Sequence, residues 1–164
     1  MSQIIVAPND EEPIYTSVFL AGGISGCRDW QREVIEELKY ADLSVFNPRR
    51  EYFDITNKKA SHEQIKWEFE RLEQMDIFSM YFCNSYSDQP ICMYELGRNI
   101  LRMQNRFPRD WQMRIAVGIE EGYMREDDVI IQLSLCAPGA FVYSNADPKA
   151  HAFLIRHLAG SLLI

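Results

Sequence analysis

Two carboxylates follow the most strand-like stretch of this 164-residue chain, residues 77–83. Asp88 lies in the next loop, and Glu95 lies in a helix-like segment, residues 90–103, that opens with Pro90. Pro90 suits a first helical turn, where its missing N–H costs nothing. Ligands bind at the carboxyl ends of strands in open parallel sheets, so both carboxylates are placed for acid, base or nucleophile chemistry. Taken alone, Glu95 is explained equally well as a solvated helix residue.

A glycine loop, residues 22–26, follows a second strand-like stretch at residues 15–21. Backbone N–H groups at Gly22 and Gly23 could approach a phosphate or a sugar closely. The loop matches neither the Walker pattern nor the dinucleotide pattern, so a plain tight turn explains it as well.

Two further groups end predicted strands at the same edge. The Asn-Pro-Arg-Arg sequence at 47–50 ends the strand at 43–46, and its arginines form either an anion clamp or a surface charge pair. The Glu-Glu-Gly sequence at 120–122 ends the strand at 113–119. Carboxylates outnumber bases in the whole set, and no Cys–His or Ser–His pair is evident. This composition favours glycosyl chemistry, which needs a carboxylate nucleophile and a proton donor to the leaving group.

Strands and helices alternate along the chain. The predicted strands are 15–21, 43–46, 77–83, 113–119 and 139–143, and the predicted helices are 30–40, 61–75, 90–103, 125–135 and one starting at 147–148. Alternation of this kind predicts an α/β fold, a doubly wound sheet of about five parallel strands with helices on both faces. Residues 1–164 are expected to form a single domain, and residues 1–14 are interpreted as an arm or a short edge strand.

The helix at 61–75 carries an acidic residue, Glu68, beside its apolar stripe. Ser61 reads as its N-cap with Gln64 at the capping-box position. The residues predicted on its buried side are Ile65, Phe69, Leu72 and Met75. Glu68 either faces water or takes part in the site.

The net charge of −7 and the pI near 5.0 argue against a nucleic-acid polymer as partner, but not against a small nucleoside or nucleotide. No signal peptide and no membrane segment are predicted. The four cysteines, at 27, 83, 92 and 136, show no paired spacing and are interpreted as reduced core thiols of a cytoplasmic protein. The three histidines are not spaced with them as metal ligands, and no metal or cofactor is expected.

Several short motifs together resemble the nucleoside 2-deoxyribosyltransferase-like superfamily, closest to a branch of mostly uncharacterised proteins. They are Val-Phe-Leu-Ala-Gly-Gly-Ile at 18–24, Asp-Trp-Gln at 29–31, Asn-Pro-Arg-Arg at 47–50, Gln-Ile-Lys-Trp-Glu at 64–68, Asp76, and Tyr-Glu-Leu-Gly at 94–97. The resemblance covers residues 15–145 and implies a flavodoxin-like sheet. Characterised members attack the anomeric carbon of a nucleoside with the Glu of the last motif and pass the sugar to another base or to water.

Carried over to this chain, the resemblance implies that Glu95 is the nucleophile, that Asp88 contacts the base and that Glu68 handles a proton. It implies a substrate-binding set of Phe19, Gly22, Gly23, Asn47, Arg49 and Tyr94. Residues 88–93 lack the Gly-rich run common before the nucleophile in the transferases, so hydrolysis and transfer both stay open.

Four alternatives follow for the function. An N-glycosidic enzyme could be a deoxyribosyltransferase, or a hydrolase of a 5′-monophosphate with an anion site at Ser25, Ser87 or the arginines at 49–50. A non-catalytic nucleotide-binding or sensing module would keep the fold without the reaction. A flavin protein is disfavoured, because the 22–26 loop lacks a hydroxyl-rich phosphate cradle. The apolar end at 162–164 and the family's sites near subunit contacts predict a homodimer or higher homo-oligomer.

Overall fold

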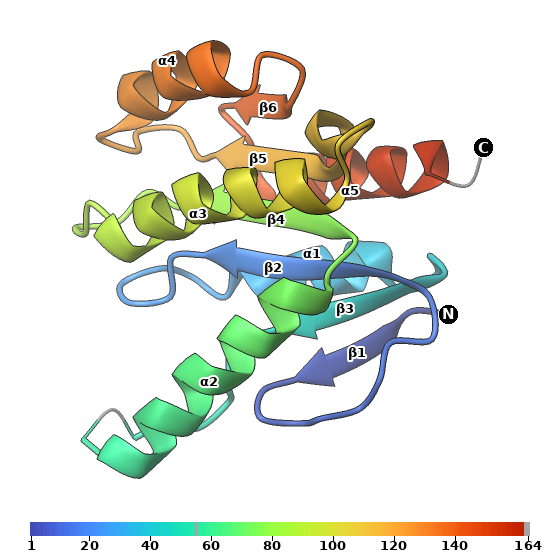
Figure 1. Ribbon diagram of the computed structural model, residues 1–164. Coiled ribbons are helices and arrows are strands. Elements are labelled where there is room, and N and C mark those ends of the chain that lie inside the picture. Colours follow the sequence, from blue (N-terminus) through green and yellow to red (C-terminus); the bar gives the residue numbers. More distant parts are fainter. Residues whose placement is uncertain (55, 163–164) are drawn as a thin grey trace.

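A computed structural model describes residues 1–54 and 56–162, and in this part of the chain six parallel strands form one sheet in the order β1-β3-β2-β4-β5-β6 (Figure 1). The strands are β1 (Gln3–Val6), β2 (Thr16–Gly22), β3 (Leu43–Asn47), β4 (Ile77–Phe82), β5 (Ile115–Ile119) and β6 (Phe141–Ser144). The helices are α1 (Trp30–Leu38), α2 (Lys58–Gln74), α3 (Pro90–Arg106), α4 (Glu126–Cys136) and α5 (Pro148–Ser161), with a short 3-10 helix η1 (Trp111–Arg114) before β5. The α/β doubly wound class is confirmed.

The strand beyond the five predicted is β1. It pairs in parallel with β3, from Gln3 opposite Ser44 to Val6 opposite Asn47. Of the two alternatives for residues 1–14, the short edge strand is therefore the one the structure adopts.

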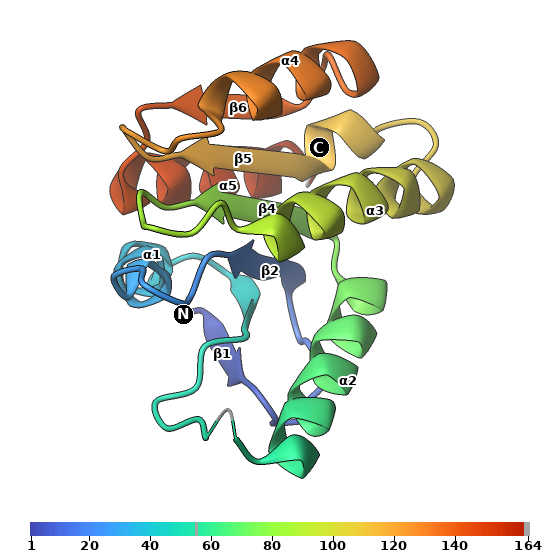
Figure 2. The same ribbon diagram turned by 90° about the vertical axis from the view of Figure 1, so that its left-hand side faces the viewer.

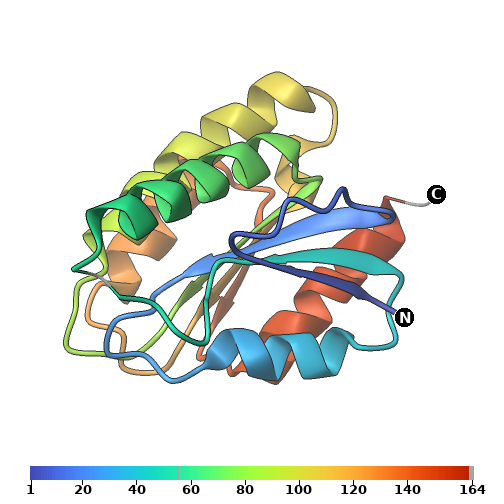
Figure 3. The same cartoon turned by 90° about the horizontal axis from the view of Figure 1, so that it is seen from below.

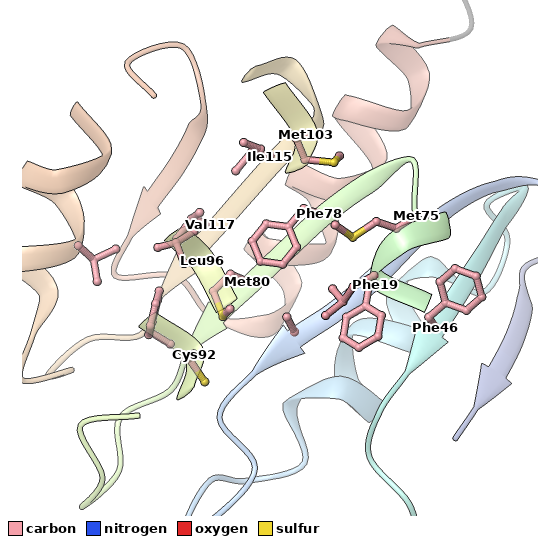
Figure 4. Close-up of a cluster of buried hydrophobic side chains, with 14 of the residues drawn as sticks. Phe19, Phe46, Met75, Phe78, Met80, Cys92, Leu96, Met103, Ile115 and Val117 are labelled. Atoms are coloured by element: carbon pink, nitrogen blue, oxygen red, sulfur yellow. The ribbon is translucent and has the colours of Figure 1, made fainter. Parts of the chain in front are cut away.

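The sheet separates two layers of helices, as Figure 3 shows for α2 and α3 on one side and α1 and α5 on the other. Apolar residues of α2, α3 and α4 share one buried cluster, and those of α1 and α5 share the other. In the first cluster, Leu96 of α3 lies beside Met80 of β4 and Val117 of β5, and Met103 of α3 lies beside Ile115 of β5 (Figure 4). Burial on both faces explains why the central strands are mainly apolar.

The chain reverses its winding direction at β2. From β2 it passes through α1 to β3 on one side, and from β3 it passes through α2 to β4 on the other side of β2. The loops that leave the carboxyl ends of β2 and β4 therefore diverge, which opens a crevice at the position where such sheets bind ligands. Figure 2 turns the side of the molecule to which β2 points toward the viewer.

The prediction for α2 is wrong at its start and for half of the residues on its predicted buried face. Asn57 is the N-cap, because its side-chain oxygen accepts hydrogen bonds from the backbone N–H of Lys59 and of Ala60. The helix thus starts at Lys58, and Ser61 and Gln64 do not cap it.

Leu72 and Met75 are buried as predicted. Ile65 and Phe69 are exposed, whereas Trp67 and Arg71 of α2 are buried in their place. The N-terminal loop explains this rotation, since the Trp67 indole N–H donates to the Asn9 carbonyl over 2.7 Å and Arg71 also reaches that loop. Tertiary hydrogen bonds therefore decided which face of α2 is buried.

The prediction that all four cysteines are reduced thiols is wrong for two of them. The structure joins Cys27, in the loop after β2, to Cys83, just past β4, in a disulfide with the two Cα atoms 6.1 Å apart. Cys92 is a buried free thiol, as expected, and Cys136 is free but exposed. Sequence spacing did not indicate the pair, because its 56-residue separation is closed only by the pairing of β2 with β4. The cytoplasmic location, which was inferred from reduced thiols, stays a prediction.

None of the helices within residues 1–54 and 56–162 combines the length and the apolar character needed to cross a lipid bilayer.

Candidate active site

A cavity of about 230 Å³ lies at the carboxyl edge of the sheet, at the crevice between the loops after β2 and β4. It is lined by Phe19, Ala21, Gly22, Gly23, Ile24, Ser25, Pro48, Glu68, Ser87, Gln89, Pro90, Ile91, Cys92 and Glu95. The lining combines apolar walls with two carboxylates, which suits a small ligand with one reacting polar centre.

The end of β2 forms one wall, and it needs glycine for steric reasons. A Cβ on Gly22 would clash with the Tyr81 carbonyl oxygen and would lie 2.6 Å from the Trp30 ring. A Cβ on Gly23 would press on Gln89 and would lie 2.7 Å from the Cys27 sulfur. The indole N–H of Trp30, which is fully buried, donates to the Gly23 carbonyl oxygen over 2.8 Å and fixes the turn.

We expect Gly22→Ala to destabilise the fold by about 1–3 kcal/mol, because its new methyl group meets backbone rather than a movable side chain. The matched control is Gly97→Ala, which should be neutral or stabilising by up to about 1 kcal/mol, because a Cβ on Gly97 of α3 would have open space around it to 4 Å among the described residues. Urea unfolding of both variants measures the difference. Equal stabilities would contradict the steric role of Gly22.

Glu95 of α3 and Glu68 of α2 both line the cavity. Burial, followed by the nearby Glu68 carboxylate, raises the pKa of Glu95 to about 7. Burial also raises the pKa of Glu68, against the opposing effects of a hydrogen bond from Gln64 and of the Arg50 charge. A pair of carboxyl groups with raised pKa values can keep one proton near neutral pH, so one group can act as an acid while the other is ionised.

Sequence reasoning missed Gln89 and Cys92 in the lining. Gln89 is buried at the N-cap of α3 in the left-handed region, with φ of 52°, and its side-chain amide donates to the Cys83 carbonyl oxygen over 2.6 Å. Pro90 at the first helical position is the signal that could have pointed to Gln89, since it marks the residue before it as the N-cap. Burial raises the pKa of the Cys92 thiol to about 12, so this group is neutral.

Asp88 and Tyr94 do not lie among the lining residues. Asp88 is exposed, and its backbone carbonyl oxygen accepts a hydrogen bond from the Tyr123 hydroxyl over 2.8 Å. Tyr94 is 64% exposed on the outer side of α3. The roles that the resemblance implies for these two residues stay predictions.

Asn47 and Arg49 also lie beside the cavity rather than in it. The Asn47 side chain accepts the backbone N–H of Arg49 over 3.0 Å and so shapes the turn after β3. The Arg49 guanidinium donates to the carbonyl oxygens of Arg28 and Cys27, at 2.8 and 3.1 Å, and to the side chain of Gln31. Arg49 therefore braces the loop after β2.

In the acidic stretch after β5, Glu120 makes its contacts outside the cavity. Glu120 accepts the backbone N–H of Asn84 over 2.7 Å and forms an ion pair with Arg28. Asp76, one of the residues in the motif set, accepts both the backbone N–H and the hydroxyl of Ser17 at 2.9 Å and so joins the starts of β2 and β4.

The residues that line the cavity include no Lys or Arg. Across the described part of the chain, no group of three or more His, Cys, Asp and Glu side chains could hold a metal ion.

Comparison with family models gives one match, described as nucleoside 2-deoxyribosyltransferase like, over residues 15–107. The matched segment runs from β2 through α3 and includes both cavity carboxylates. A comparison with curated proteins found no match.

Proposed function

Since the chain belongs to the nucleoside 2-deoxyribosyltransferase-like family, we propose that it cleaves or transfers the N-glycosidic bond of a nucleoside, with Glu95 as nucleophile and Glu68 as proton donor. The observation that carries this proposal is the placement of two carboxyl groups, from two different helices, in one cavity at the switch point of the sheet. Burial raises the pKa of both groups there.

In the proposed reaction, a Glu95 carboxylate oxygen attacks C1′ of the sugar while the C1′–N bond breaks. The base leaves with that electron pair and takes a proton from Glu68. A second base or a water molecule then attacks C1′ and gives its proton to Glu68, and the bond between Glu95 and C1′ breaks with its electrons returning to the carboxylate. The reaction uses the state of the pair in which Glu68 carries the proton and Glu95 is ionised, and the pKa of about 7 lets Glu95 ionise near neutral pH.

The charge of the cavity favours a substrate without a phosphate group. Glu68 and Glu95 are its only ionisable oxygen acids among the lining residues, and no Lys or Arg joins them. Arg49 is engaged with backbone carbonyl oxygens, and Arg50 pairs with Glu63 at 3.3 Å. A 5′-monophosphate would meet hydroxyl groups of Ser25 and Ser87 without a cation, so we favour an unphosphorylated nucleoside over the 5′-monophosphate.

Incubation with a panel of nucleosides and their 5′-monophosphates, followed by chromatography, tests the proposal. Release of free base from a nucleoside is the expected result, and a new nucleoside in the presence of a second free base would identify transfer. Binding of nucleosides without any base release would instead support the non-catalytic module. Faster release from a 5′-monophosphate would overturn the substrate preference.

We also propose a homo-oligomer. Of the apolar end that suggested one, Leu162 packs partly against the core, and residues 163–164 lie outside the described residues. Exposed apolar side chains on α2 and α3 now support the proposal: Ile65, Phe69, Ile91, Tyr94 and Leu101. Light scattering at micromolar concentration should return at least twice the 19.2 kDa chain mass. A monomer mass under these conditions would refute it.

A further inference from the structure

Gln64 connects the wall of the cavity to one of its carboxyl groups. From the second turn of α2, its side-chain nitrogen Nε2 donates to the Pro48 carbonyl oxygen over 2.7 Å and to Oε1 of Glu68 over 2.7 Å. Gln64 is buried, with 8% of its surface exposed. The sequence placed this residue in a cap, and the proposed reaction does not use it.

The direction of these hydrogen bonds follows from chemistry. The Pro48 carbonyl oxygen can only accept, so the end of the amide that faces it must be the NH₂ group. The second proton of the same nitrogen is then directed to Glu68. The Gln64 oxygen is buried without a hydrogen-bond partner among the described residues, so the observed orientation is retained without help from that atom.

We propose that Gln64 is a positioning residue, which holds Oε1 of Glu68 as a hydrogen-bond acceptor and leaves Oε2 as the oxygen that carries the transferred proton. Its catalytic consequence rests on the proposed function, but the hydrogen-bond coupling itself does not. A carboxyl group whose Oε1 accepts from an amide carries any proton on its other oxygen, so the donor has one defined position instead of two.

The charged and titratable groups around Glu68 agree with this role. Arg50, from the loop after β3, favours the ionised form of Glu68, while Glu95 and the neutral thiol of Cys92 face it from α3. Arg98 acts on Glu95 from the same helix. Loss of the Gln64 donor should therefore favour the protonated form of Glu68, and Glu95 should then ionise at lower pH because its neighbour carries a negative charge over a narrower pH range.

The first test needs no variant at the residue itself. In a pH titration of the ¹⁵N-labelled protein, the side-chain NH₂ signals of Gln64 should shift with the protonation of Glu68. In Glu68→Gln this shift should disappear. The proposal would be overturned, whether or not the protein has activity, if the chemical shifts of the Gln64 NH₂ signals did not change with pH or changed equally in Glu68→Gln.

The second test uses Gln64→Met, which keeps the shape and removes the donor. ¹³C NMR of the carboxyl groups should show opposite shifts, with the Glu68 midpoint higher and the Glu95 midpoint lower than in wild type. With an active nucleoside, kcat should fall about 10-fold with KM unchanged, and the acidic limb of the rate profile should move to lower pH. The matched control is Gln31→Met, a buried glutamine that contacts Arg49 instead, which should leave both midpoints in place. Midpoints that move together, or that move equally in the control, would contradict the positioning role.

Discussion

Glu95→Gln should lower the rate of base release by about 10³-fold or more, because the amide cannot form the bond to C1′ that the proposed reaction requires. The comparison uses whichever nucleoside the wild-type protein cleaves. With a 2-fluoro sugar analogue, the wild-type protein should gain the mass of the sugar and the variant should not.

The control is Glu121→Gln, a change of the same kind at an exposed residue outside the cavity, which should keep the wild-type rate. Asp88→Asn, tested beside it, measures what the exposed loop carboxylate contributes. Equal rates for wild type and Glu95→Gln would show that the nucleophile is another group.

The stability of Glu95→Gln shows whether this variant is folded. The folded-state pKa of Glu95, about 7, lies above the value of 4.5 for a free side chain, so its stabilising contribution is present below pH 4.5 and is lost as pH rises through 7. Glu95→Gln removes this loss and should be more stable than wild type at pH 8, by up to about 3 kcal/mol. Loss of activity together with this gain in stability would separate a catalytic effect from misfolding.

Acid should destabilise the protein through His151, a residue that does not line the cavity. Its ring is fully buried against Trp30 and Tyr81, and one ring nitrogen shares a hydrogen bond of 2.7 Å with the Ser79 hydroxyl. Burial lowers the pKa of His151 to about 3.

The unfolded chain therefore binds a proton at His151 below about pH 6.5 while the folded protein does not. The stability contributed by neutral His151 is present above that pH and falls by about 1.4 kcal/mol for each pH unit below it. Between pH 6.5 and 5 the loss is about 2 kcal/mol. Glu95 acts with the opposite sign over part of this range, so the measurement must be a difference between variants.

The double variant His151→Leu with Ser79→Ala replaces both partners of the hydrogen bond by apolar groups. Urea unfolding at pH 7 and pH 5 should show a smaller loss of stability on acidification than in wild type, by about 2 kcal/mol. His62→Gln, at an exposed histidine, should follow wild type. Parallel losses in wild type and double variant would mean that His151 is not the titrating group.

The sequence by itself determined the fold class and the position of Glu95. Alternation of apolar strands with amphipathic helices is a local pattern, and each strand and its following helix can be read without knowing their neighbours. Pro90 and Asp147 likewise mark helix starts through local hydrogen bonding, and both mark the helix starts that the structure has. Glu95 could be placed because it follows a strand end directly in the chain.

Only the tertiary structure decided which other residues accompany Glu95. The buried face of α2 depends on hydrogen bonds from Trp67 and Arg71 to the N-terminal loop. The same orientation of α2 turns Glu68 and Gln64 toward the site. Asp88 is close to Glu95 in sequence yet lies outside the cavity, whereas Glu68 lines the cavity although it is 27 positions away from Glu95. Sequence distance does not measure distance across a sheet edge, because strand order, set by packing of the whole chain, decides which loops meet.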